Sequence, residues 1–152
     1  MVPYAINICK TPIMKYNYNW AGKKILIVED DQSSYVYMSE LFKHYNAGIS
    51  RNINGLDAFF FCMNHNPDVV IMDLLIQGLN GYDATTLIKK FNPSIPVIVV
   101  TACAMKEERL KSREAGCDIF LTKPILPADI LPVVDHFLSE KVGIAGKQVV
   151  QL

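Results

Sequence analysis

The stretch KKILIVEDDQSS (residues 23–34) joins an apolar segment directly to a cluster of negative charge. Four consecutive apolar residues, 25–28, are typical of a strand that is buried on both faces of a sheet. Three carboxylates, Glu29, Asp30 and Asp31, follow at once. Because like charges this close together repel one another, the cluster favours a functional role at the end of that strand.

Short apolar runs alternate with helical patterns along the rest of the chain. Strands are predicted at residues 25–28, 49–53, 69–72, 97–100 and 119–121. Helices are predicted at residues 33–44, 55–65, 82–91, 105–115 and 128–141. Gly116 suits the end of the fourth helix, whereas Pro132 is expected to delay or kink the last one. This alternation predicts an α/β fold, a doubly wound three-layer sandwich with a mostly parallel sheet.

Composition excludes several classes of function. The 152 residues fit about one domain, and 15 basic residues balance 15 acidic ones. This balance argues against direct nucleic-acid binding and against a polybasic membrane anchor. The chain also lacks an apolar run of about 20 residues that could span a membrane. Its four cysteines form no C-x-x-C pair, which argues against zinc and favours a reducing, cytoplasmic location.

The predicted domain covers residues 23–141. Residues 1–22 are interpreted as a flexible N-terminal tail, and residues 142–152 as a C-terminal tail or linker stub.

Polar residues follow the strong strands at their carboxyl ends. Glu29 and Asp30 follow the first, Asp73 the third, Thr101 the fourth and Lys123 the fifth. In a parallel sheet these ends share one edge, where ligands bind. Clustered carboxylates suit Mg²⁺, and a lysine and a threonine beside them suit a phosphoryl group, with a carboxylate as nucleophile.

The motifs ILIVEDD, VVIMDLLIQGLNGYD, VIVVTA and EAGCDIFLTKP occur in this order over residues 23–140. In this respect the chain resembles the receiver domain of two-component response regulators. The resemblance implies a flavodoxin-like (βα)5 fold with a five-stranded parallel sheet in the order 2-1-3-4-5.

The resemblance also implies a metal site. Asp73 would be the phosphoacceptor, Asp30 would bind Mg²⁺ directly, and Glu29 would act mainly through a bound water. The backbone carbonyl of Leu75 would supply a further ligand, and Mn²⁺ is expected to substitute for Mg²⁺.

Other implied roles concern the phosphoryl group and a switch. Thr101 and Lys123 would each contact a phosphoryl oxygen, and Phe120 occupies the aromatic switch position. Pro124 would follow a cis peptide bond, and Gly81 would serve the turn after the active-site loop.

The loop after Asp73 departs from the family pattern. Ile76 and Gln77 stand where Met-Pro is usual. Leu75 and Cys103 occupy the two positions that flank the path of hydrolytic water in the family. Because leucine cannot orient water and a thiol does so weakly, slow self-dephosphorylation is expected.

The expected function is a stoichiometric signalling step rather than enzymatic turnover. A sensor histidine kinase or a histidine phosphotransfer protein would donate the phosphoryl group from a phosphohistidine. The surface formed by residues 105–115, 119–121 and 128–141 would then switch and bind a partner or a second copy.

Two alternatives remain open. One is a pseudo-receiver that serves only as a docking module. The other is a Mg²⁺-dependent aspartyl phosphatase, which is disfavoured because Leu75 stands where such enzymes carry an acid/base aspartate. Asp31 has a simpler interpretation, as the N-cap of the first helix.

Overall fold

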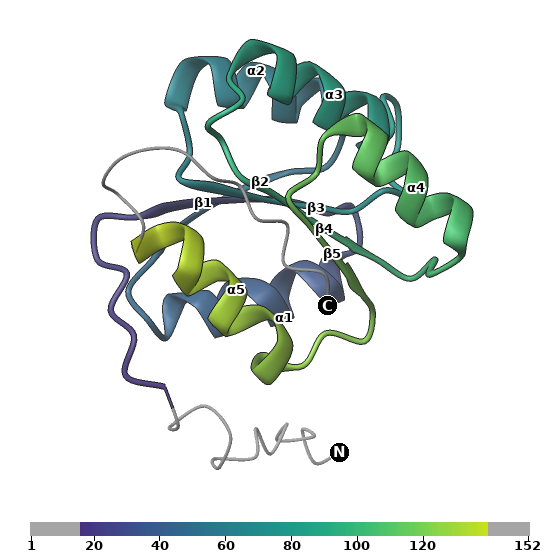
Figure 1. Ribbon diagram of the computed structural model, residues 1–152. Helices are drawn as coiled ribbons and strands as arrows, with labels where there is room; N and C mark the ends of the chain where they lie inside the picture. Colours follow the sequence, from purple (N-terminus) through teal and green to yellow (C-terminus); the bar gives the residue numbers. More distant parts are fainter. Residues whose placement is uncertain (1–15, 140–152) are drawn as a thin grey trace, which may run out of the picture.

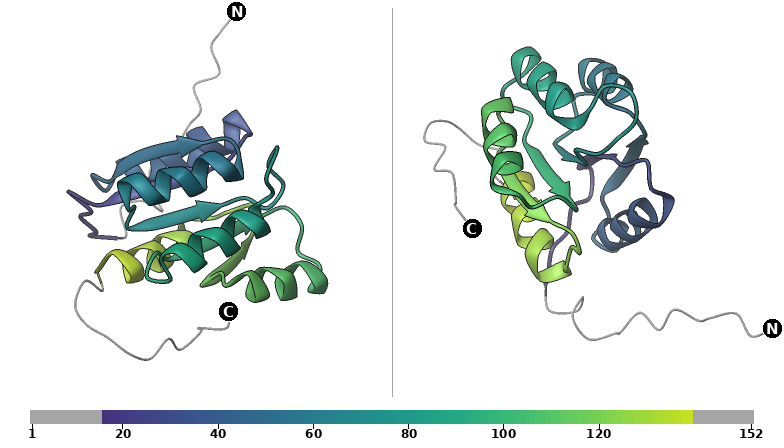
Figure 2. Two further views of the ribbon diagram at one scale, coloured as in Figure 1. Left: turned by 90° about the horizontal axis from the view of Figure 1, so that it is seen from above. Right: turned by 90° about the vertical axis from the view of Figure 1, so that its right-hand side faces the viewer.

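The computed structural model describes residues 16–139, which form five strands and five helices in strict alternation. Figure 1 shows the sheet between two layers of helices, and the two further views in Figure 2 agree. The elements are β1 (Lys24–Val28), α1 (Gln32–Lys43), β2 (Gly48–Asn52), α2 (Gly55–His65), β3 (Val69–Met72), α3 (Gly81–Phe91), β4 (Val97–Thr101), α4 (Lys106–Ala115), β5 (Ile119–Thr122) and α5 (Pro127–Ser139). All strand pairs are parallel, in the order β2-β1-β3-β4-β5. The predicted doubly wound fold and its strand order are therefore confirmed.

The three central strands, β1, β3 and β4, are buried on both faces of the sheet, which explains the unbroken apolar runs in the sequence. Ile25 and Ile27 of β1 point into the core under α1 and α5, whereas Leu26 and Val28 point into the core under α2 and α3. Successive residues of a strand face opposite sides of the sheet, so a strand covered on both sides needs apolar residues throughout. Figure 1 shows α1 and α5 on one side and α2, α3 and α4 on the other.

Three helices begin with polar N-caps. The side chains of Asp31, Asn54 and Asn80 each accept a hydrogen bond from the backbone N–H three residues further on. Such caps satisfy one of the free amides at a helix start. The interpretation of Asp31 as an N-cap is confirmed, and Gly116 ends α4 in the left-handed conformation, at φ 96°.

Helix α5 differs from the expectation in one respect. Pro132 lies inside the helix, which begins at Pro127 and is not delayed. A proline cannot donate a backbone hydrogen bond to the carbonyl four residues earlier, here that of Ala128. Pro132 is exposed, and the neighbouring Leu131 and Val134 are fully buried. The buried apolar side chains of α5 thus hold the helix on the sheet on both sides of the proline.

The last residues of the expected N-terminal tail are not a tail. Trp20 is only 2% exposed, and its indole N–H donates to Asp135 of α5 at 2.8 Å. Tyr18 stacks on Trp20 and Tyr16 stacks on Tyr18. The prediction of a flexible segment was wrong for residues 16–22, because these aromatic side chains extend the core under α1 and α5. The remainder of the expected tail, and residues 140–152, lie outside the described residues.

Acidic residues at the amino ends of the strands have structural partners. Asp68, just before β3, accepts a hydrogen bond from the N–H of Lys24 at 2.8 Å. Asp118, just before β5, accepts one from the N–H of Val97 at 2.8 Å and forms an ion pair with Lys89. Each aspartate thereby fixes the start of a neighbouring strand.

Among residues 16–139, no helix is both long enough and apolar enough to cross a membrane.

Candidate functional site

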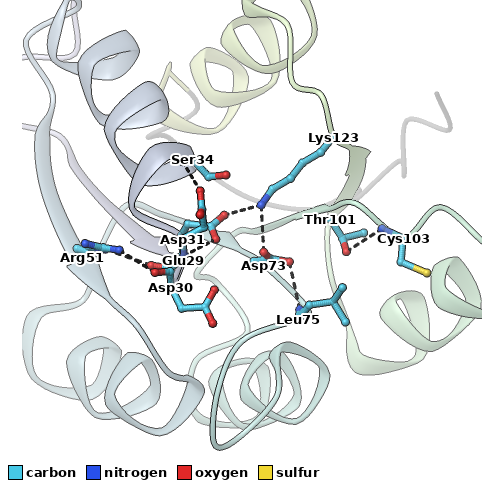
Figure 3. A network of polar contacts seen from close by, with 10 residues as sticks. All are labelled: Glu29, Asp30, Asp31, Ser34, Arg51, Asp73, Leu75, Thr101, Cys103 and Lys123. Carbon is cyan, nitrogen blue, oxygen red and sulfur yellow. Dashed lines mark hydrogen bonds and ion pairs between the residues drawn. The ribbon is translucent and has the colours of Figure 1, made fainter.

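The candidate site lies at the opposite edge of the sheet, where the carboxyl ends of four strands meet. Glu29 and Asp30 follow β1, Asp73 follows β3, Thr101 ends β4 and Lys123 follows β5. Figure 3 shows these side chains converging from their separate strands. The parallel topology thus brings together residues up to 94 positions apart, as in the bond between Lys123 and Glu29.

Three carboxylates form the acidic part of the site. Ligand oxygens of Glu29, Asp30 and Asp73 all lie within 4.8 Å of one another. Glu29 is 1% exposed and Asp73 7% exposed. A cluster of hard oxygen donors with this spacing fits the coordination preferences of Mg²⁺. A cation there would also relieve the mutual repulsion of the three groups.

Lys123 is the positive partner of two of these carboxylates. Its ammonium nitrogen lies 2.6 Å from Glu29 Oε2 and 3.1 Å from Asp73 Oδ2. Burial by itself lowers the pKa of Lys123, but the hydrogen bonds and charges of Glu29 and Asp73 outweigh it, so the pKa is raised. Lys123 therefore remains charged and can neutralise negative charge on an incoming anion.

The electrostatics of Glu29 have a different balance. Burial raises the pKa of its carboxyl group, although hydrogen bonds from Lys123 and from the N–H of Asp31 act in the opposite direction. The N–H of Asp31 donates to Glu29 Oε1 at 3.0 Å. Glu29 is thus held firmly in place while its charged form is disfavoured by burial.

Asp73 is held by the loop that follows β3 and by the start of α3. Its Oδ1 accepts a hydrogen bond from the N–H of Leu75 at 3.1 Å, while Oδ2 faces Lys123. The start of α3 presses on its backbone, because a Cβ atom on Gly81 would lie 2.3 Å from the carbonyl oxygen of Asp73. Only glycine fits at position 81 without displacing the chain that carries Asp73. The expectation that Gly81 serves this turn is thereby given a physical reason.

Two loops flank the carboxylate of Asp73. Thr101 is fully buried, and its hydroxyl oxygen accepts a hydrogen bond from the N–H of Cys103 at 3.3 Å. Leu75 is 64% exposed, so its side chain lies at the rim rather than in the core. Figure 3 shows Leu75 next to Asp73 and Cys103 next to Thr101.

Phe120 and Pro124 lie at the side of the site. Phe120 is half-buried in β5, and the guanidinium of Arg109 in α4 lies 4.7 Å from the centre of its ring. The peptide bond between Lys123 and Pro124 is cis, as expected. A groove beside Phe120 runs between β5 and α5, lined by residues that include Ile125 and Pro132.

Sequence reasoning missed one residue of the site, Arg51 of β2. Its guanidinium hydrogen-bonds to the backbone carbonyls of Glu29 and Asp30 (Figure 3). A lone arginine near the end of a strand gives no signal in a single sequence. Its role follows only from the pairing of β2 with β1, which places it beside the acidic loop.

The sequence matches the response regulator receiver domain over residues 25–135. This match covers most of the chain, and the site and the strand order agree with it. The chain therefore belongs to the response regulator receiver domain family of two-component systems.

Individual relatives agree with this assignment. The chain is 30% identical over 120 residues to the polar-differentiation response regulator DivK of Brucella anthropi, covering 78% of this chain and 98% of that protein. It is 30% identical to the transcriptional regulatory protein CusR of Escherichia coli K12, covering 76% of this chain and 51% of CusR. The chain thus spans about half the length of CusR.

A solved structure supports the fold independently. The receiver domain of the sensor histidine kinase PA1611 from Pseudomonas aeruginosa PAO1, described with a magnesium ion in its active-site cleft, superposes with a TM-score of 0.74. The identity is 24%, and the alignment covers 79% of this chain and all of that one. At this identity the likeness concerns the fold.

Proposed function

We propose that this chain is a phosphoacceptor domain that receives a phosphoryl group on Asp73 in the presence of Mg²⁺. The observation that carries the proposal is the arrangement around Asp73. Its carboxylate lies 3.1 Å from the ammonium of Lys123 and within 4.8 Å of the ligand oxygens of Glu29 and Asp30. A nucleophile, a cation for the phosphoryl oxygens and a donor set for a metal are thus side by side.

The donor would be a phosphohistidine of a sensor histidine kinase or of a histidine phosphotransfer protein. A carboxylate oxygen of Asp73 attacks phosphorus, the phosphorus–nitrogen bond breaks, and its electron pair leaves with the imidazole nitrogen. Lys123 and the hydroxyl of Thr101 are placed to bind phosphoryl oxygens. Glu29, Asp30, Asp73 and the backbone carbonyl of Leu75 would hold Mg²⁺, or Mn²⁺ in its place. The bound ion would neutralise negative charge during the transfer.

The output would be a change of surface rather than a released product. A phosphoryl group adds about −1.5 to −2 charge units to the pocket. Thr101 would move toward it, and Phe120 would turn inward from its half-buried position. The face formed by α4, β5 and α5 would then bind a partner or a second copy. The proposed function is therefore a stoichiometric signalling step. It would take place in the cytoplasm, without direct binding to nucleic acid or membranes.

The test is intact-protein mass spectrometry after incubation with a small phosphodonor and Mg²⁺. We expect one added phosphoryl group that is removed by hydroxylamine and is missing in Asp73→Asn. Asn80→Ala, in the N-cap of α3, serves as a control with an unchanged acidic set. An unmodified chain would favour the docking module without phosphorylation, and continuous release of phosphate over many turnovers would favour the phosphatase.

A further inference from the structure

Arg51 makes four contacts, two with the loop that carries the acidic cluster and two with the start of α1. Its Nε donates to the carbonyl oxygen of Glu29 at 3.1 Å, and its Nη2 donates to that of Asp30 at 3.2 Å. Its Nη1 donates to Oε1 of Gln32 at 2.5 Å. The face of the guanidinium lies over the ring of Tyr35, 4.4 Å from its centre. One side chain of β2 thus binds the whole turn between β1 and the first turn of α1.

The chemistry of these contacts requires an arginine. Three nitrogens of one rigid, planar fork donate in three directions while the flat face stacks on an aromatic ring. A lysine carries the same charge on a flexible stem and cannot hold these acceptors together in a fixed geometry. The arrangement therefore does more than supply a positive charge.

The three carboxylates of the site differ in how they are held. Glu29 accepts hydrogen bonds from Lys123 and from the N–H of Asp31. Asp73 accepts them from Lys123 and from the N–H of Leu75. Within residues 16–139, the carboxylate of Asp30 has no hydrogen bond or ion pair. Its position depends on the backbone that carries it, and Arg51 is the side chain that holds this backbone.

We propose that Arg51 is a positioning residue for the metal site, because it fixes the β1–α1 turn so that the carboxylate of Asp30 faces those of Glu29 and Asp73. This inference rests on the proposed function, since it assigns Arg51 to the Mg²⁺ site of that function. Three like charges on neighbouring elements tend to move apart when no cation is bound. By holding the backbone, Arg51 keeps the donor set assembled before the metal arrives, so less ordering accompanies binding.

A purely electrostatic role predicts the opposite result. If Arg51 acted only through its charge, removing it would make the site more negative and Mg²⁺ would bind more tightly. A purely structural role would lower thermal stability and leave the affinity of the folded protein for Mg²⁺ unchanged. The three roles are therefore distinguished by the direction of one measured change.

The experiment is isothermal titration calorimetry of the full chain with MgCl₂. We compare the unaltered protein with Arg51→Lys, Arg51→Gln and Gln32→Ala, and with the control Arg113→Gln, which removes an exposed arginine of α4. Loss of a side chain that orients metal ligands typically weakens binding by about tenfold or more. We expect about a tenfold loss in both Arg51 variants, a smaller loss in Gln32→Ala and no change in Arg113→Gln. The fluorescence of Trp20, the only tryptophan in the chain, reports whether each variant is folded.

The outcomes separate the inference from the proposed function. Unchanged affinity in Arg51→Lys, or tighter binding in Arg51→Gln, overturns the positioning role while the receiver function stands. An unaltered protein that binds no Mg²⁺ overturns the metal site itself. If Arg51→Gln fails to fold, Arg51→Lys still decides the question, because unchanged binding in that variant contradicts the inference.

Discussion

The two edges of the sheet both carry acidic residues at strand ends, but they use them differently. At the amino edge, Asp68 and Asp118 each accept a backbone N–H of a neighbouring strand, and Asp118 is also paired with Lys89. At the carboxyl edge, the carboxylates of Glu29, Asp30 and Asp73 lie together, and the ammonium of Lys123 pairs with two of them, those of Glu29 and Asp73. An acid whose charge is matched serves the fold, whereas an excess of negative charge in a buried place calls for a cation. The balance of charge, rather than the presence of acids, identifies the functional edge.

The largest expected effect comes from a substitution at the amino edge. Asp118→Asn removes the charge that faces the largely buried ammonium of Lys89, whose side chain is 10% exposed. We expect a loss of about 2–3 kcal/mol in the free energy of unfolding, measured by urea denaturation, because an ammonium without its counter-charge is costly to bury. Asp73→Asn, measured without Mg²⁺, is the matched variant at the other edge, and its stability should not fall. An equal loss in the two variants would contradict the division between a structural and a functional edge.

The next prediction concerns how long the carboxyl edge stays phosphorylated. Hydrolysis needs a water held opposite the carboxylate that leaves, and the exposed Leu75 at the rim offers no hydrogen bond to such a water. Leu75→Asn is expected to speed the decay of phosphorylated protein roughly ten- to a hundredfold, about 1–3 kcal/mol of barrier. The decay is followed by the loss of the phosphoryl group in intact-mass spectra.

Two comparisons control this measurement. Leu110→Asn changes an exposed leucine of α4 and should leave the decay unchanged. Decay of the unaltered protein within seconds, with no effect of Leu75→Asn, would show that the side chain at position 75 does not limit access of water.

Adding or removing Mg²⁺ should change thermal stability through the carboxyl edge alone. Binding to the folded state stabilises by mass action, by about 1.4 kcal/mol when free Mg²⁺ is tenfold above its dissociation constant. We expect the melting temperature to rise with millimolar MgCl₂ and to return with EDTA. Asp30→Ala should lose most of this gain, whereas Asp68→Ala, at the amino edge, should keep it. A melting temperature that does not respond to Mg²⁺ in the unaltered protein would argue against the site.

The smallest expected effect is a pH dependence that arises from Glu29. Burial raises the pKa of its carboxyl group above the ordinary value of 4.5. At a pH between the ordinary pKa of the unfolded chain and the raised pKa of the folded protein, the folded protein keeps a proton that the unfolded chain has released. The contribution of Glu29 to the free energy of unfolding therefore falls as pH rises through this range, and it stays lower above the raised pKa. Glu29→Gln should therefore raise the melting temperature of the metal-free protein at mildly alkaline pH, and hardly at all below pH 4.5. A gain of the same size at both pH values would mean that the ionisation of Glu29 is not responsible.

Much of this molecule was determined by local sequence. Unbroken apolar runs such as Val69–Met72 encode strands that are covered on both faces, and the alternation with helices leaves little choice but a parallel sheet. Parallel strands place their carboxyl ends at one edge, so the convergence of Asp73, Thr101 and Lys123 could be predicted without coordinates. The cap that Asp31 provides for α1 was also predictable, because its hydrogen-bond partner lies only three residues further along the chain.

What only the tertiary structure decided are contacts between side chains whose partners lie far away in the chain. Trp20 looked like part of a tail because its partner Asp135 is 115 residues distant. Arg51 looked like an ordinary strand residue because the carbonyl groups that it binds belong to the neighbouring strand's loop. Periodicity in a sequence records which side of an element is buried, and it does not record which residue of another element lies against it. The sequence therefore determined where the acidic residues gather, and the packing of β2 against β1 determined what holds them there.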